Sequence, residues 1–228
     1  MKSVSTQRLY HYWQDLRGSR PAPERRDIEP AAIKALLSDV FILEHTEGAN
    51  FDFRLAGSSL CAAYCRELKG RAFRQFWNEE DLEALDTTLL AIREDAAAAV
   101  IGYHGVNSRG QRAPFEMLLL PLRYGGSDYP RILGISVPHD TDYWIGLHPI
   151  MHHDITSMRL IWPDEQPAFL RNAVNADTML EDDLLSGSGS FPTLVEPGND
   201  VFVRDTTMAD TRATARRQAF RIIDGGRS

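Results

Sequence analysis

Hydrophobic residues near the start of the chain repeat with the period of an α-helix. In residues 5–17, Leu9, Trp13 and Leu16 follow one another at spacings of four and three, with polar residues between them. This spacing brings the three side chains onto one face. We therefore predict a short amphipathic helix, which Gly18 ends.

Two further stretches show helical spacing of their apolar residues. Residues 27–37 predict a second short helix, with Pro30 in its first turn. Residues 78–96 predict the longest helix, which Asn78 would cap. Acidic residues follow Asn78 directly, and their charge suits the positive end of a helix dipole.

Extended segments flank these helices. Strand patterns occur at residues 38–46, 51–56, 98–106, 113–124 and 131–138. A shorter apolar segment, 158–162, leaves one more strand open. The first two strands predict a hairpin and the next three a meander, because short glycine-containing loops join them. We predict an α+β fold with a five-stranded antiparallel sheet, helices on one face and the N-terminal helix beside it.

The predicted strand 113–124 has apolar residues on both of its faces. A sheet of this kind needs cover on both sides. The helices between the strands cover one face, while the N-terminal helix, a second subunit or both could cover the other. We expect a homodimer with the N-terminal helix at its interface. Its candidate dimer or partner surface consists of Leu9, Trp13, Leu16, Leu118 and Leu120.

Composition and charge restrict the class of protein. The 228 residues are 43% hydrophobic and 25% charged, with a net charge of −7. These values predict a folded core and argue against nucleic acid or an anionic membrane as partner. The chain has no secretory signal pattern and two cysteines. We therefore expect a cytoplasmic protein with free thiols.

The last part of the chain differs in charge from the rest. Residues 163–200 contain eight acidic residues and one arginine, whereas residues 201–228 are basic. We predict three parts: an N-terminal helix and connector over 1–26, a folded domain over 27–162, and an acidic linker with a basic tail over 163–228. We expect this last part to be partly disordered, because it includes the linker-like SGSGS.

Several ordered motifs give the chain a resemblance to a known family. RLAGSSLCAAYCRELKG and the opening YWQDLRGSRPAPERRDIEP, with the FILE that follows, resemble a PAS-domain family typical of alphaproteobacteria. The resemblance implies the PAS fold and a stand-alone sensor or regulatory module that dimerises, binds small ligands and contacts signalling partners such as histidine kinases. It implies no enzyme, and the length leaves no room for an attached kinase. P-loop, nucleophile-elbow and HExxH motifs are also missing.

The same resemblance implies a pocket between the sheet and its helices. The side chains predicted to line it are Phe53, Tyr64, Cys65, Trp77, Tyr103 and Met117. The alternative is that these side chains fill the core and leave no space for a ligand. A small-molecule or metal sensor, driven by its bound ligand, is the alternative function.

Cysteine and histidine patterns raise the question of a metal or cofactor. On a helix, Cys61 and Cys65 would share one face, but no second pair completes a zinc site. His148 and His152, in HPIMHHD, are expected in a solvated loop. A flavin-reactive cysteine motif is missing, and the longest predicted helix has no histidine for haem. The identity of any ligand stays unknown, and the sequence argues against haem, flavin and zinc.

Overall fold

The computed structural model describes residues 1–165, except 48–49, 126–128 and 141. These residues belong to one compact unit. The predictions for the acidic linker and basic tail therefore fall almost entirely outside the described residues. None of the described helices is long and apolar enough to cross a membrane.

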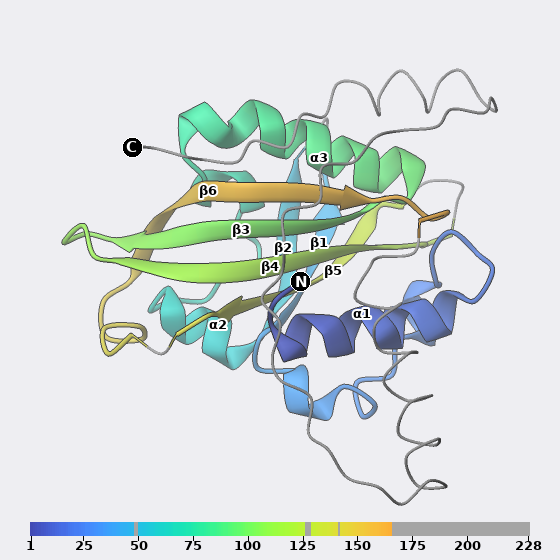
Figure 1. Ribbon diagram of the computed structural model, residues 1–228, viewed down its shortest axis with the longest axis horizontal. Coiled ribbons are helices and arrows are strands. Elements are labelled where there is room, and N and C mark those ends of the chain that lie inside the picture. Colours follow the sequence, from blue (N-terminus) through green and yellow to red (C-terminus); the bar gives the residue numbers. More distant parts are fainter. Residues whose placement is uncertain (48–49, 126–128, 141, 166–228) are drawn as a thin grey trace, which may run out of the picture. The chain divides into compact units, whose positions relative to one another are not determined.

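Among the described residues, six α-helical or 3-10 segments precede the long helix, three before the first hairpin and three after it (Figure 1). The helical elements are α1 (Val4–Arg17), η1 (Arg25–Asp27), η2 (Lys34–Leu36), α2 (Ser58–Ala63), η3 (Phe73–Phe76), η4 (Glu79–Asp81) and α3 (Leu82–Asp95). The predicted N-terminal helix and the long helix are thus present. The helix predicted over 27–37 is wrong, because the chain there makes only 3-10 turns around Pro30.

All the strands of the described residues belong to one antiparallel sheet, in the order β2-β1-β5-β4-β3-β6. They are β1 (Val40–His45), β2 (Phe51–Ala56), β3 (Ala98–Asn107), β4 (Arg112–Leu122), β5 (Arg131–Pro138) and β6 (Ile150–Ile161). The predicted mixed α+β fold is confirmed, but the sheet has six strands rather than five. The sixth is long and pairs along the whole of β3.

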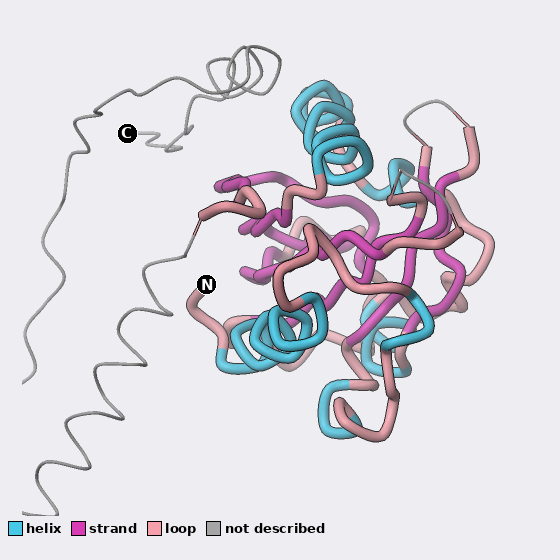
Figure 2. Tube along the Cα trace, turned by 90° about the vertical axis from the view of Figure 1, so that its right-hand side faces the viewer, coloured by secondary structure: helices cyan, strands magenta, loops and turns pink. Residues whose placement is uncertain are grey.

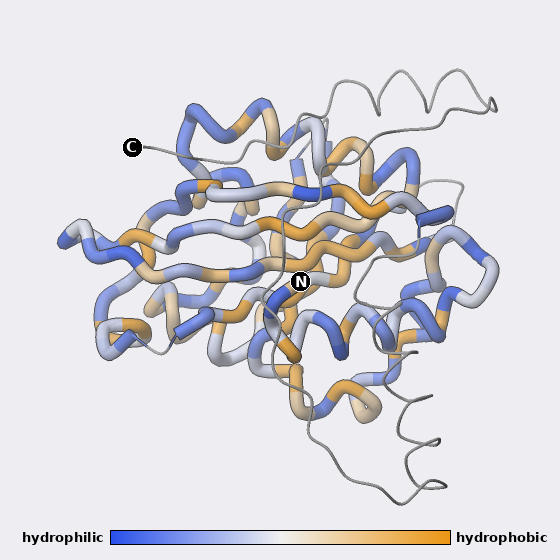
Figure 3. Tube along the Cα trace, viewed as in Figure 1, coloured by the Kyte–Doolittle hydropathy of each residue, from blue (hydrophilic) through white to orange (hydrophobic). Residues whose placement is uncertain are grey.

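The two faces of the sheet have different covers (Figure 2). On the inner face, α2, η3 and α3 enclose the main hydrophobic cluster, which includes Leu85, Leu89 and Ile92 of α3. On the outer face, α1 packs against β4 and β5. Figure 3 shows the most hydrophobic stretches along the middle strands, between these layers. The expected requirement for cover on both faces is met for β4 within a single chain.

Gly134 on β5 shows how closely side chains pack on neighbouring strands of the sheet. A Cβ at this position would collide with the ring of Phe41, which lies on the neighbouring strand β1. The phenyl ring therefore occupies the space that a side chain on β5 would need. Only glycine fits here, for a reason of packing rather than backbone conformation.

Candidate functional site: an aromatic core around His153

Five of the six side chains predicted to line a pocket lie together in the main hydrophobic cluster. Each is 5% exposed or less: Phe53, Tyr64, Trp77, Tyr103 and Met117. They come from β2, the end of α2, the end of η3, β3 and β4, so distant segments meet at one place. Their role as ligand contacts stays a prediction.

Cys65 is not part of this cluster. The helix α2 ends at Ala63, and Cys65 follows with a positive φ of 50° and an exposed side chain. Cys61 is half-buried at the rim of the cluster. The predictions that the two cysteines share a helix face and that Cys65 lines the core are therefore wrong. Among the described residues, no group of three or more metal-ligating side chains comes together.

His153 is the central side chain that the sequence analysis missed. HPIMHHD was expected to be a solvated loop, but residues from Ile150 onward form β6, and His153 is 1% exposed. Two irregularities in the pairing of β6 with β3 break the period of two that marks a half-buried strand. The one sequence signal for a strand here was the segment ITSMRLI that follows, which contains β-branched residues.

Aromatic rings surround the imidazole of His153 on several sides. Its ring centre lies 4.3 Å from that of Tyr103 and 4.6 Å from that of Trp77, and Phe76 stacks on it at 6.2 Å. Tyr64 approaches edge-on at 5.8 Å. Such contacts fix the position of the imidazole more tightly than burial alone would.

Two short hydrogen bonds run through this aromatic core. The Tyr64 hydroxyl lies 2.5 Å from Nε2 of His153, and the Tyr103 hydroxyl lies 2.7 Å from Oγ of Ser136 on β5. Burial lowers the pKa of His153 to about 3 and raises the pKa of both tyrosines. Each of these groups is therefore neutral at pH 7, and the core contains polar atoms without charge.

Two polar atoms of this core have no hydrogen-bond partner among the described residues. They are Nδ1 of His153 and Nε1 of Trp77, and both are buried. Whichever nitrogen of His153 carries the proton, Nδ1 is left with an unused donor or acceptor. Unpaired buried polar atoms cost free energy and are uncommon in native proteins. These two unpaired atoms distinguish this core from an entirely apolar one.

Polar contacts tie β6 to the start of the long helix. Asn78 donates from its side chain to Asp154, and the Ile155 amide donates to Oδ2 of Asp81 at 2.9 Å. Arg112 forms an ion pair with Asp154 at 2.7 Å. The side chain of Asn78 does not cap the helix, which corrects that expectation. These contacts hold the strand that carries His153 against the helical layer.

The predicted dimer surface is largely internal to one chain. Leu9, Trp13, Leu118 and Leu120 are buried, and Leu16 is half-buried. Nε1 of Trp13 donates to the carbonyl oxygen of Pro121 on β4 at 2.9 Å. The helix α1 therefore occupies the face where a partner was expected. Four of these five side chains are not exposed to a second subunit, and dimerisation itself stays a prediction.

A buried carboxylate fastens the start of α1 to the sheet. Glu116 on β4 accepts hydrogen bonds from the backbone amides of Lys2 (2.7 Å) and Ser3 (3.0 Å) and from Oγ1 of Thr6 (2.5 Å). Burial alone would raise the pKa of Glu116, but the bonds from Thr6, Lys2 and Ser3 outweigh it and lower the pKa. A carboxylate also suits the N-terminus of a helix.

Comparisons with known proteins found similar solved structures and a matching family model. A solved light-oxygen-voltage domain studied with a flavin analogue is similar at 16% identity and a TM-score of 0.39, covering 64% of this chain and 96% of that one. The PAS domain of an HTR-like protein from Haloarcula marismortui is similar at 22% identity and a TM-score of 0.35, covering 47% and 89%. No curated protein sequence matches. The family model PAS_5, described as a PAS domain, matches residues 1–137. The match covers more than half of the chain, which therefore belongs to the PAS-domain family and has the PAS fold.

Proposed function

We propose that this chain is a cytoplasmic regulatory module that acts through direct contact with a signalling protein in a histidine-kinase pathway. Its membership of the PAS-domain family supports a sensory signalling role. We propose further that it works as a homodimer, and that it is not an enzyme. Nucleic acid and membrane are not its partners in this proposal, in line with the net charge of −7.

Exposed apolar side chains in the connection from β5 to β6 and at the start of β6 carry the proposal of a protein partner. Tyr143, Leu147 and Met151 are 76%, 69% and 45% exposed. Large exposed apolar side chains close together in a chain are typical of contact surfaces. This connection leads directly into the strand that carries His153, so a partner bound there would be coupled to the aromatic core.

Affinity capture with the full chain as bait tests this proposal. We expect capture of a signalling protein from cells that naturally make this chain, and reconstitution with the purified partner. The triple variant Tyr143→Ser, Leu147→Ser, Met151→Ser should lose the interaction. Val4→Ser is the matched control, because Val4 is 65% exposed but lies on α1. Capture that is equal for the triple variant and the control would contradict the proposal.

A second candidate function is a small-molecule sensor whose ligand sits in the aromatic core. The unpaired Nδ1 of His153 and Nε1 of Trp77 favour it, because a ligand with a donor or acceptor would satisfy them. A neutral ligand is expected, because the core groups are neutral and burying a charge there would be costly. Haem, flavin and zinc are not the expected occupants.

Native mass spectrometry of the purified full chain tests the second candidate. We expect a bound species whose mass exceeds that of the chain, and its loss in His153→Phe and Trp77→Phe. Neither variant alters Gly134 or Glu116, so the packing of these two residues is preserved. A chain that carries no added mass, and whose melting temperature responds to no compound in a neutral-metabolite screen, would contradict this candidate.

A further inference from the structure

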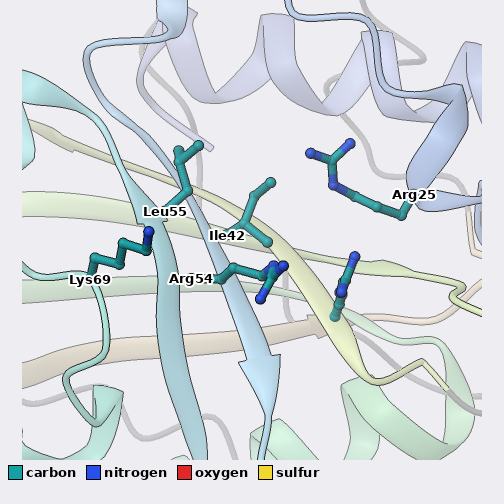
Figure 4. A pocket seen from close by; sticks show the side chains of 6 residues that line it. Arg25, Ile42, Arg54, Leu55 and Lys69 are labelled. Carbon is teal, nitrogen blue, oxygen red and sulfur yellow. The ribbon is translucent and has the colours of Figure 1, made fainter.

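A pocket lies on the outer face of the sheet, away from the aromatic core. It has a volume of about 320 Å³, and its lining residues are Arg25, Ile42, Arg54, Leu55, Lys69 and Arg131. Figure 4 shows these side chains arriving from separate segments, with Lys69 and Arg25 on opposite sides. Four of the six are cationic, and the other two provide an apolar surface between them.

A bulge in the first hairpin creates one side of this pocket. The pairing of β1 with β2 shifts between Ile42 and Leu43, so that Arg54 is an extra residue on β2. Bulges re-aim side chains, and here the consecutive residues Arg54 and Leu55 are both exposed. Leu55 pairs with the buried Ile42 and is 46% exposed. A regular strand would have placed one of these two side chains on the inner face.

Two of the cations are held in fixed positions by a shared carboxylate. Oε1 of Glu44 accepts from Arg131 at 2.6 Å, and Oε2 accepts from Arg54 at 2.9 Å. The guanidinium of Arg131 also lies over the ring of Tyr124, at 3.6 Å from its centre. Arginine at such a site presents a planar fork of donors that suits carboxylate and phosphate groups.

The other two cations, Arg25 and Lys69, lie without a counter-ion among the described residues. Among the described residues, neither Arg25 nor Lys69 forms an ion pair or a side-chain hydrogen bond. Within the described residues, Glu44 is therefore the one carboxylate with which any of the four cations pairs, and an excess of positive charge remains. Like charges brought this close repel one another, so an anion between them would stabilise the arrangement.

We propose that this pocket binds a small organic anion in which two phosphate or carboxylate groups are joined to a short apolar part. The separate positions of Arg25 and Lys69 account for two acidic groups, and Leu55 with Ile42 accounts for the apolar part. A volume of about 320 Å³ is at the small end of ligand pockets, which favours a small molecule over a protein segment. The site is distinct from the aromatic core, which contains neutral polar groups.

Calorimetric titration of the full chain tests this site, with inorganic pyrophosphate, ADP and citrate as probes and adenosine as the uncharged comparison. We expect saturable binding of at least one of the three anions and none of adenosine. Replacing the two unpaired cations, in Arg25→Gln with Lys69→Gln, should weaken that binding roughly tenfold or more, because a charge-assisted hydrogen bond is lost at each. Amide NMR signals of Arg54, Leu55 and Lys69 should shift on binding.

Arg109→Gln is the matched control, because Arg109 is an exposed cation in the turn between β3 and β4, outside the pocket. The substitution removes one positive charge outside the pocket, so the affinity of the chain for the anions should stay unchanged. An equal loss in this control would show non-specific charge attraction and overturn the proposal. Lack of saturable binding of all three anions would overturn it as well. Binding of an acidic glutamate–leucine peptide, but of no small anion, would replace it with a protein partner.

Discussion

Glu116→Gln tests how α1 is held on the outer face of the sheet. The carboxylate accepts three hydrogen bonds, from Lys2, Ser3 and Thr6, with both of its oxygens. A glutamine amide has one oxygen, and its NH₂ group would face a donor. Hydrogen bonds to a charged group contribute about 1.5–3 kcal/mol each, so we expect the variant to lose about 2 kcal/mol of unfolding free energy.

The pH dependence of this loss has a definite sign. Because the pKa of Glu116 is lowered in the folded state, its contribution to stability is complete above the pKa of the unfolded chain, about 4.3. It is lost as the pH falls through the folded pKa. Wild type and variant should therefore differ at pH 7, and the difference should shrink as the solution becomes strongly acidic.

Hydrogen exchange with mass spectrometry, combined with urea denaturation, measures both effects. Peptides that cover α1 should exchange faster in Glu116→Gln than in wild type at pH 7. Glu44→Gln is the control, because Glu44 is a paired carboxylate on β1 and its arginine partners lie outside α1. Unchanged protection of α1 in the Glu116 variant, or a stability difference that persists in strong acid, would refute the reasoning.

Three further predictions concern the core and the cysteines. The pKa of His153 is about 3 in the folded state, so as the pH falls below about 6.5 its imidazole takes up a proton in the unfolded chain but not in the folded chain. The free energy of unfolding should therefore fall by about 1.4 kcal/mol per pH unit in this range. Urea denaturation should show that His153→Phe removes this contribution, whereas an unchanged slope would contradict the buried neutral imidazole. Gly134→Ala should lose about 2–3 kcal/mol of unfolding free energy in the same assay, because its Cβ collides with Phe41. A near-neutral effect would show that the Phe41 ring is packed less tightly against β5. A thiol reagent should label the exposed Cys65 faster than Cys61, and equal rates would contradict their different exposure.

The sequence predicted those elements whose pattern is local. The strand Phe51–Ala56 begins with clean alternation, and the long helix has a continuous stripe of leucines, so each was visible without knowledge of its neighbours. The requirement for cover on both faces of β4 was also visible. Which segment would provide that cover was not, because the contact of Trp13 with Pro121 joins residues far apart in the chain.

The candidate site was only partly predictable for a related reason. Large aromatic residues such as Trp77 and Tyr103 are expected in a core from their type alone. The burial of His153 depends on the irregular register of β6 against β3, which no period in the sequence reports. The bulge that exposes Arg54 and Leu55 together is likewise a property of strand pairing. The type and spacing of residues in the sequence therefore predicted the aromatic side chains of the core. The register of strand pairing determined the position of His153 within that core and the shape of the outer pocket.

Photo-crosslinking in cells tests the proposed function most directly. A photoreactive phenylalanine derivative would replace Tyr143, which is exposed between β5 and β6, and in a parallel strain Val4, which is exposed on α1. Our account predicts a covalent adduct with one signalling protein from position 143 and none from position 4. Equal adducts from both positions, or none from position 143, would contradict it.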